Sequence, residues 1–188
     1  SRNARFLSDL LGMDIPVAEG AALPLNADTY APSDYVHGFE GLGNITEIPQ
    51  IGQNDPRSAA QFLCDMATKH AGELVICGIG PLTNIADAIA YDPSFITKVK
   101  SLVIMGGAYA RAGNITSYAE ANIFHDPIAA DAVFGSGMAI TMVGLDATMK
   151  TLLTPTDFDD LEKSAPKVGG FIKQISEFYL TFYRSVGV

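Results

Sequence analysis

Three short apolar runs alternate with helical patterns, and this alternation restricts the fold more than any other feature of the chain. The runs cover residues 73–79, 99–105 and 139–144. Between them, apolar residues recur with the period of a helix. Such an order predicts βαβ crossovers, a mostly parallel sheet and helices on both faces. We therefore predict an α/β fold with an open, Rossmann-like sheet.

The remaining segments fit one domain over residues 1–188, a length that allows a substantial core. Residues 15–18 suggest a short strand, and residues 21–54 suggest a long loop. The run at residues 73–79 is continuous enough for a strand buried on both faces. Further helices are predicted at residues 3–12, 56–70, 82–91, 127–135, 157–163 and 166–184.

Composition narrows the class of partner. The formal net charge of −9 argues against nucleic acid and against an anionic membrane surface, since both attract basic patches. The chain has no apolar run of about 18 residues, so we expect no transmembrane helix. Cys64 and Cys77 form no CxxC pair and fit buried free thiols, which suggests a reducing, cytoplasmic compartment.

The polar segment at residues 105–127 (MGGAYARAGNITSYAEANIFHDP) follows the second apolar run. Polar loops at the carboxyl ends of buried strands are where α/β proteins place their chemistry. In an extended segment Glu120 and Asn122 would point to one face, where a carboxylate and an amide could bind vicinal hydroxyls. The alternative is structural: Asn114 and Asn122 would form turns, and Glu120 would cap a helix.

Three other motifs carry both a functional and a structural interpretation. His37 could donate a proton to a leaving group, or it could be a solvated loop histidine. The segment at residues 79–84 (IGPLTN) could offer a free carbonyl to a ligand, or simply turn a strand into a helix. The Gly pair after Met105 could admit a ligand close to the backbone, or form a bulge or tight turn.

Several catalytic classes are disfavoured by what the sequence lacks. It contains no nucleophile elbow of the serine hydrolases, no GxxxxGK phosphate loop and no zinc-type Cys/His spacing. A covalent serine hydrolase, an NTPase and a zinc protein are therefore not expected.

Taken together, the motifs resemble the nucleoside hydrolases of the inosine-uridine-preferring type. The resemblance spans nearly the whole chain, with blocks in family order and at family-like spacing. The blocks are DIPVAEGAALPL at 14–25, HG at 37–38, GLG at 41–43, GPLTNIA at 80–86, VIMGG at 103–107, GNITSYAEANIFHDP at 113–127 and TMVGLD at 141–146. The resemblance implies an open, mostly parallel sheet and hydrolysis of the N-glycosidic bond of ribonucleosides to ribose and free base.

The resemblance also implies a role for particular residues. The residues that would hold the ribose hydroxyls are Asn114, Glu120 and Asn122. Met105 would line the ribose pocket, His37 would approach the base, and the backbone carbonyl of Ile79 would bind Ca²⁺. Such a cation would orient the attacking water, and the carboxylate would stabilise an oxocarbenium-like sugar. The implied partner is a small-molecule ribonucleoside, and we expect a homo-oligomer.

The chain also departs from the family pattern. It shows neither the N-terminal strand with its DxDxGxDD aspartate cluster nor the C-terminal His-Asp-Pro segment, so Ca²⁺ ligands other than Ile79 are absent from it. Ala121 stands where many members carry an aromatic residue. We expect a fragment of a nucleoside hydrolase that alone neither binds Ca²⁺ tightly nor hydrolyses nucleosides.

Two other hypotheses remain open. The first is a non-catalytic nucleoside- or ribose-binding or interaction protein that has lost the metal site. The second is an unrelated small α/β domain with coincidental loops.

Overall fold

The computed structural model describes residues 1–25, 33–45, 48–49 and 52–185. These residues form two compact units. One unit comprises Ser1–Val17, Pro32–Asn54 and Leu153–Val188, and the other comprises Ala18–Ala31 and Asp55–Leu152. The two units are described separately below.

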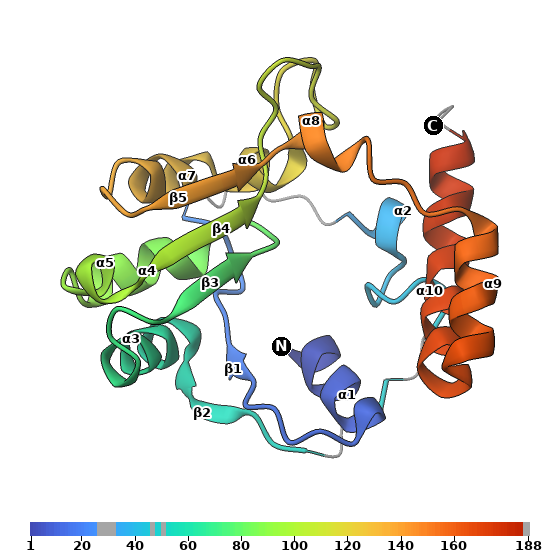
Figure 1. Cartoon of the computed structure of the whole chain (residues 1–188), viewed down its shortest axis with the longest axis horizontal. Coiled ribbons are helices and arrows are strands. Elements are labelled where there is room, and N and C mark those ends of the chain that lie inside the picture. The colour runs from blue at the N-terminus through green and yellow to red at the C-terminus, as the bar shows by residue number, and fades with distance from the viewer. Residues whose placement is uncertain (26–32, 46–47, 50–51, 186–188) are drawn as a thin grey trace. The chain divides into compact units, whose positions relative to one another are not determined.

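The second unit contains two parallel sheets (Figure 1). Strands β3 (Val75–Gly78), β4 (Ser101–Met105) and β5 (Ile140–Val143) lie in sequence order. Strands β1 (Ala18–Glu19) and β2 (Asp55–Ser58) form the second sheet. All these pairings are parallel and neither sheet closes on itself, so the predicted α/β class is confirmed.

Helices pack against one face of the three-stranded sheet. They are α3 (Ala59–Lys69), α4 (Thr83–Tyr91), the short α5 (Phe95–Lys98) and α7 (Pro127–Phe134). Leu102 and Ile104 on β4 are fully buried in this core beside Phe95. Burial of each such side chain contributes about 1.5–3 kcal/mol to folding. The core therefore fixes the strands whose carboxyl ends bear the polar loops.

The prediction that residues 73–79 are buried on both faces is wrong. Ile76 is buried, but Val75 is 51% exposed and Ile79 is 77% exposed. Cys77 lies on the same exposed face, so only Cys64 is a buried thiol. Burial alternates along β3 because the core cluster contacts only one of its faces.

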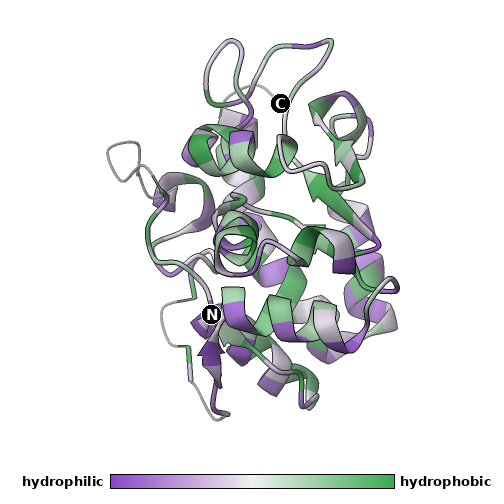
Figure 2. Cartoon of the chain, turned by 90° about the vertical axis from the view of Figure 1, so that its left-hand side faces the viewer, coloured by the Kyte–Doolittle hydropathy of each residue, from purple (hydrophilic) through white to green (hydrophobic). Residues whose placement is uncertain are grey.

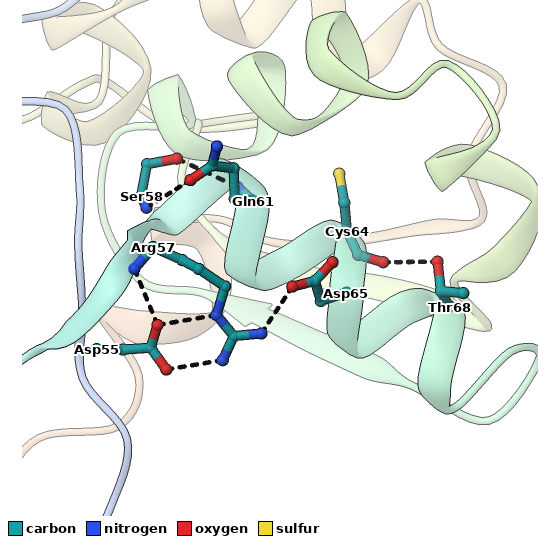
Figure 3. Close-up of polar contacts among 7 residues, drawn as sticks. All are labelled: Asp55, Arg57, Ser58, Gln61, Cys64, Asp65 and Thr68. Atoms are coloured by element: carbon teal, nitrogen blue, oxygen red, sulfur yellow. Dashed lines mark hydrogen bonds and ion pairs between the residues drawn. The ribbon is translucent and has the colours of Figure 1, made fainter.

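The helix expected to begin at Pro56 begins at Ala59, because residues 55–58 pair with β1 as strand β2. Ser58 then caps α3: its hydroxyl accepts from the N–H of Gln61, and the Gln61 side chain accepts from the N–H of Ser58 (Figure 3). This capping box satisfies two N–H groups at the helix start and fixes the boundary.

The described residues of the first unit include four helices. They are α1 (Arg2–Leu11), α2 (Asp34–His37), α9 (Pro155–Ser164) and α10 (Pro166–Ser185). Three of them match predicted helices, whereas α2 lies in the segment predicted as loop. Residues 26–32, 46–47 and 50–51 of that segment lie outside the described residues.

Glycines set two features of the first unit. Gly12 ends α1 with φ of 65°, and its N–H bonds back to the helix carbonyls. Gly169 lets α10 approach α9, because a Cβ there would lie 2.2 Å from the carbonyl oxygen of Leu161.

The helices of the chain carry both hydrophobic and hydrophilic residues (Figure 2). Among the helices described, none is both long enough and apolar enough to cross a bilayer.

Candidate functional site

The carboxyl ends of β3 and β4 bring two of the predicted site residues to one edge of the sheet. Gly78 pairs with Ile104, so Ile79 and Met105 occupy the next register position of the two neighbouring strands. The Ile79 side chain is exposed beyond the strand end, and Met105 is half-buried. Open α/β sheets bind ligands outside this edge.

Glu120 is held just beyond the end of β4. It is 2% exposed and forms the N-cap of α6 (Ala121–His125). Its Oε1 accepts from the N–H of Asn122 at 2.9 Å. Its Oε2 accepts from the N–H groups of Gly107 at 2.9 Å and Ile123 at 3.2 Å. The capping role that the sequence left open is therefore present in the structure.

Asn122 lies within α6, so the expectation of an extended segment holding both Glu120 and Asn122 is wrong. The reason is that Glu120 can satisfy the free N–H groups at a helix start. The two side chains nevertheless meet at the same strand end. The Asn122 amide donates to the carbonyl oxygen of Met105 at 3.0 Å and contacts its sulfur at 3.2 Å.

Asn114 reaches the same helix start from the loop at residues 106–120. Its Oδ1 accepts from the N–H of Ala121 at 2.9 Å, while its own N–H donates to the carbonyl of Ala119. The loop is folded tightly there, since a Cβ on Gly113 would lie 2.1 Å from the Ala119 oxygen. Met105, Asn114, Glu120 and Asn122 are thus brought together around the beginning of α6.

A further carboxylate, Asp146, anchors this loop and was not singled out in the sequence. It lies in the short helix α8 (Leu145–Thr148), directly after β5. Its two oxygens accept from the N–H groups of Tyr109 and Ala110 at 2.8 and 2.9 Å. These hydrogen bonds hold the pKa of the Asp146 carboxyl below its usual value. An acidic residue at the end of an apolar run is the signal that could have identified it.

Asp126 was predicted only to begin a helix, yet among the described residues of the second unit it is the most deeply buried carboxylate. It is 0% exposed and caps α7, where its Oδ1 accepts from the N–H of Ala129. Its Oδ2 accepts from the hydroxyl of Thr83 at 2.6 Å and from the N–H of Leu25 at 2.9 Å. The local sequence around Asp126 gives no signal for its contacts with Thr83 and Leu25.

His37 belongs to the first unit, at the end of α2. Its ring stacks on Tyr179 of α10, with centroids 5.8 Å apart and planes at 18°. Partial burial against this neighbour lowers the pKa of the His37 imidazole, because the charged form loses hydration. His37 is therefore mainly neutral at pH 7, and a neutral imidazole can still donate one hydrogen bond.

The part of the chain that the structure describes does not by itself match a calcium site. Within the described ranges, no three His, Cys, Asp or Glu side chains lie close enough together to hold a metal ion. Ca²⁺ takes six to eight oxygen ligands, often several carboxylates. The Ile79 carbonyl could supply one of them, and we assign no chemical step to a bound cation.

Comparison with known proteins agrees with the fold. The family profile described as "Inosine-uridine preferring nucleoside hydrolase" matches residues 1–187. The chain is 42% identical over 190 residues to "Uridine nucleosidase 1" of Arabidopsis thaliana, covering 100% of the chain and 56% of that protein.

Solved structures give the same result. A plant nucleoside hydrolase superposes with a TM-score of 0.91 at 38% identity, over 97% of this chain and 58% of that one. The purine-preferring ribonucleoside hydrolase from Gardnerella vaginalis gives 0.92 at 36% identity, over 99% and 60%.

These nucleoside hydrolase structures match almost every residue of the chain. The open parallel sheet with its polar loop at the carboxyl edge therefore has a nucleoside hydrolase fold. The chain belongs to the inosine-uridine preferring nucleoside hydrolase family. It spans little more than half the length of the relatives named above.

Proposed function

We propose that the whole protein hydrolyses the N-glycosidic bond of ribonucleosides, releasing ribose and the free base. The observation that supports this most directly is the meeting of Glu120, Asn122 and Met105 at the end of β4. Membership of the family supplies the reaction class. A single domain that includes both compact units is part of the proposal.

In this proposal the sugar is bound by Asn114, Glu120 and Asn122, and Met105 lines the pocket. The three N–H groups that bind Glu120 fix its carboxylate in one orientation and leave lone pairs for a ribose hydroxyl. A fixed negative charge also favours the positive charge that develops on the sugar ring during cleavage. Asn122 keeps its side-chain carbonyl oxygen for the substrate, because its amide nitrogen donates to the carbonyl oxygen and the sulfur of Met105.

His37 would act on the leaving base. Its stacking on Tyr179 orients the ring, and its lowered pKa keeps the imidazole mainly neutral. From that state it could donate a hydrogen bond to a base nitrogen as the glycosidic bond breaks.

The remaining assignments follow family resemblance. We propose Ca²⁺ as the metal, with the Ile79 carbonyl as one ligand and the others from parts of the protein outside this chain. A homo-oligomer and a cytoplasmic role in nucleoside catabolism and salvage complete the proposal. Calcium can be tested by measuring activity after chelation and after the return of Ca²⁺ or Mg²⁺.

The test of the proposed function is ribose release from inosine and uridine by the whole protein. The Glu120→Ala variant should lose at least a hundredfold in kcat/KM, as expected when a preorganised charge is removed. The matched control is Glu73→Ala, which removes an exposed carboxylate before β3. A wild-type protein that releases no ribose, or a Glu120→Ala variant as active as Glu73→Ala, would refute the proposal.

A second candidate is nucleoside or ribose binding without catalysis. The observation that favours it is the contrast between an assembled sugar side and the lack of a three-residue metal group in the described part of the chain. It predicts that inosine binds with the same affinity with and without EDTA. Calorimetry in both buffers separates the two candidates, because a metal-dependent site should bind the nucleoside more weakly after chelation.

A further inference from the structure

We infer that Asp126 is a positioning residue that locks three loops together beside the sugar-binding residues. Its effect on catalysis rests on the function proposed above, whereas its effect on the loops does not. The three segments are residues 20–25 after β1, the turn after β3, and the junction between α6 and α7. None of the roles proposed above uses Asp126.

The contacts of the Asp126 carboxylate join residues far apart in the chain. Oδ1 accepts from Ala129 at 3.0 Å, which is the bond of an ordinary helix cap. Oδ2 accepts from Thr83, 43 residues earlier, and from Leu25, 101 residues earlier. A residue that only caps a helix would leave this second oxygen to water.

Burial makes these contacts obligatory. Asp126 is 0% exposed, and its three partners are neutral donors. A buried carboxylate must be hydrogen-bonded, and removal of one donor leaves charge that neither water nor protein satisfies. The start of α7 fixes the position of the Asp126 carboxylate, and the carboxylate in turn fixes the positions of Leu25 and Thr83.

A second contact joins two of the same segments. The Oδ1 of Asn84 accepts from the N–H of Ala21 at 2.8 Å. The adjacent Gly20 lies so close that a Cβ on it would stand 2.7 Å from the Asn84 amide nitrogen. Residues 20–25 are thus attached to the beginning of α4 directly through Asn84 and indirectly through Asp126, which binds both Leu25 and Thr83.

These contacts bear on the site through short stretches of chain. Thr83 is four residues after Ile79, and Asp126 is four residues after Asn122. A shift of α4 relative to α7 would move the Ile79 carbonyl away from the side chains at the beginning of α6. Misplacement of a substrate-binding group by about 1 Å can lower the rate by about a hundredfold.

The first experiment measures the loops without reference to activity. Amide hydrogen exchange of Leu25 is followed in Asp126→Asn, which places an amide among three donors. Exchange at Leu25 should become at least tenfold faster. The control is Ser58→Ala, which removes a helix cap in the same unit and should leave Leu25 unchanged. Unchanged protection of Leu25 in Asp126→Asn would overturn the inference.

The second experiment separates positioning from simple stability. In the whole protein, Thr83→Val removes one donor to Asp126 and should lower kcat/KM about tenfold, whereas Thr83→Ser should restore it to within twofold. Ser58→Ala, which loses stability through a different cap, should keep its activity. Equal losses in Thr83→Val and Ser58→Ala, or no loss in Thr83→Val, would overturn the positioning role.

The two experiments also distinguish this inference from the proposed function. If the wild-type protein releases no ribose, the proposed function fails, and hydrogen exchange at Leu25 still decides whether Asp126 locks the loops.

Discussion

The carboxylate of Glu120 accepts a hydrogen bond from the backbone N–H of Gly107 at 2.9 Å, and so joins the beginning of α6 to the end of β4. Gly107 makes the bond possible, because its φ of 81° turns the chain there and a side chain at this position would meet Met142. The same carboxylate is the proposed sugar ligand. The local structure and the proposed sugar binding therefore depend on the same buried group.

This relationship predicts that Glu120→Ala will destabilise the fold as well as abolish activity. Loss of the cap and of the Gly107 bond should lower the free energy of unfolding by about 1–3 kcal/mol. Urea denaturation measures the change. Glu73→Ala, at the surface, should stay within about 0.5 kcal/mol of wild type. Equal stability of the two variants would contradict the contacts assigned to Glu120.

Gly38 should tolerate substitution less well than Gly12. Both have positive φ, so alanine is strained at either position. At Gly38 a Cβ would also lie 2.0 Å from the carbonyl oxygen of Gly43, whereas at Gly12 it would meet nothing within 4 Å. Gly12→Ala should cost about 1 kcal/mol and Gly38→Ala clearly more. Thermal unfolding of both variants measures the difference, and equal costs would argue against the close approach.

The Asp55–Arg57 pair beside α3 should be visible in acid titration (Figure 3). Hydrogen bonds from the side chain and then the backbone of Arg57 lower the pKa of Asp55 to about 2. Since this folded-state pKa lies below the ordinary 3.8, Asp55 stabilises the fold above that pH and loses its effect as the pH falls toward 2. In Arg57→Met the pKa should return toward 3.8, as measured by NMR of the carboxyl carbon.

Lys98→Met is the matched control for that titration. Lys98 is the main cause of the lowered pKa of Asp92, also about 2. This variant should therefore raise the pKa of Asp92 and leave Asp55 unchanged. The reverse pattern in either variant would show that the two pairs are wrongly assigned.

His37 should make the first unit less stable in mild acid. Its pKa is lowered by burial, so the folded state binds fewer protons than the unfolded state between the lowered pKa and the ordinary 6.5. The contribution of His37 to stability should therefore be complete above pH 6.5 and be lost as the pH falls through this interval, with no further loss from His37 below it. His37→Phe keeps the ring against Tyr179 without titrating. Its urea midpoint should change less between pH 8 and pH 5 than that of wild type.

The two cysteines should react very differently with a maleimide. Cys77 is exposed, whereas Cys64 is buried and its thiol pKa is raised, first by desolvation. Under native conditions mass spectrometry should show one label, on Cys77, and a second only in denaturant. The Cys77→Ser variant should remain unlabelled when native. Rapid labelling of Cys64 would contradict the burial of α3 against the core.

The sequence predicted the elements that depend on local pattern. The apolar runs gave β3, β4 and β5, and the predicted helix start at Pro127 follows from proline at the first helical position. Helix α9, predicted from residue 157, begins two residues earlier at Pro155. Strand β2 was missed because Asp55, Pro56 and Arg57 have no apolar alternation, and only pairing with β1 makes them extended. One-sided burial of β3 was missed because coverage of a strand depends on its neighbours.

The sequence singled out Met105, Asn114, Glu120 and Asn122, which the structure brings together, but it did not give their geometry. Glu120 and Asn122 were placed on one extended face, whereas a helix cap brings them together. The long-range contacts of Asp126 and Asp146 were missed because these partners lie at least 36 residues away, a distance at which local pattern carries no signal. The roles of the site residues in binding ribose stay predictions.

The loop at residues 106–120 is fastened at both ends, by Glu120 on Gly107 and by Asp146 on Tyr109 and Ala110. Tyr118, in the outer part of the loop, is 91% exposed and takes part in none of these hydrogen bonds. Exposed residues of this loop can therefore change without loss of the hydrogen bonds that hold its ends. Substitution of an exposed residue such as Tyr118, in evolution or by design, could change which molecules approach the protein while the ends of the loop stay in place.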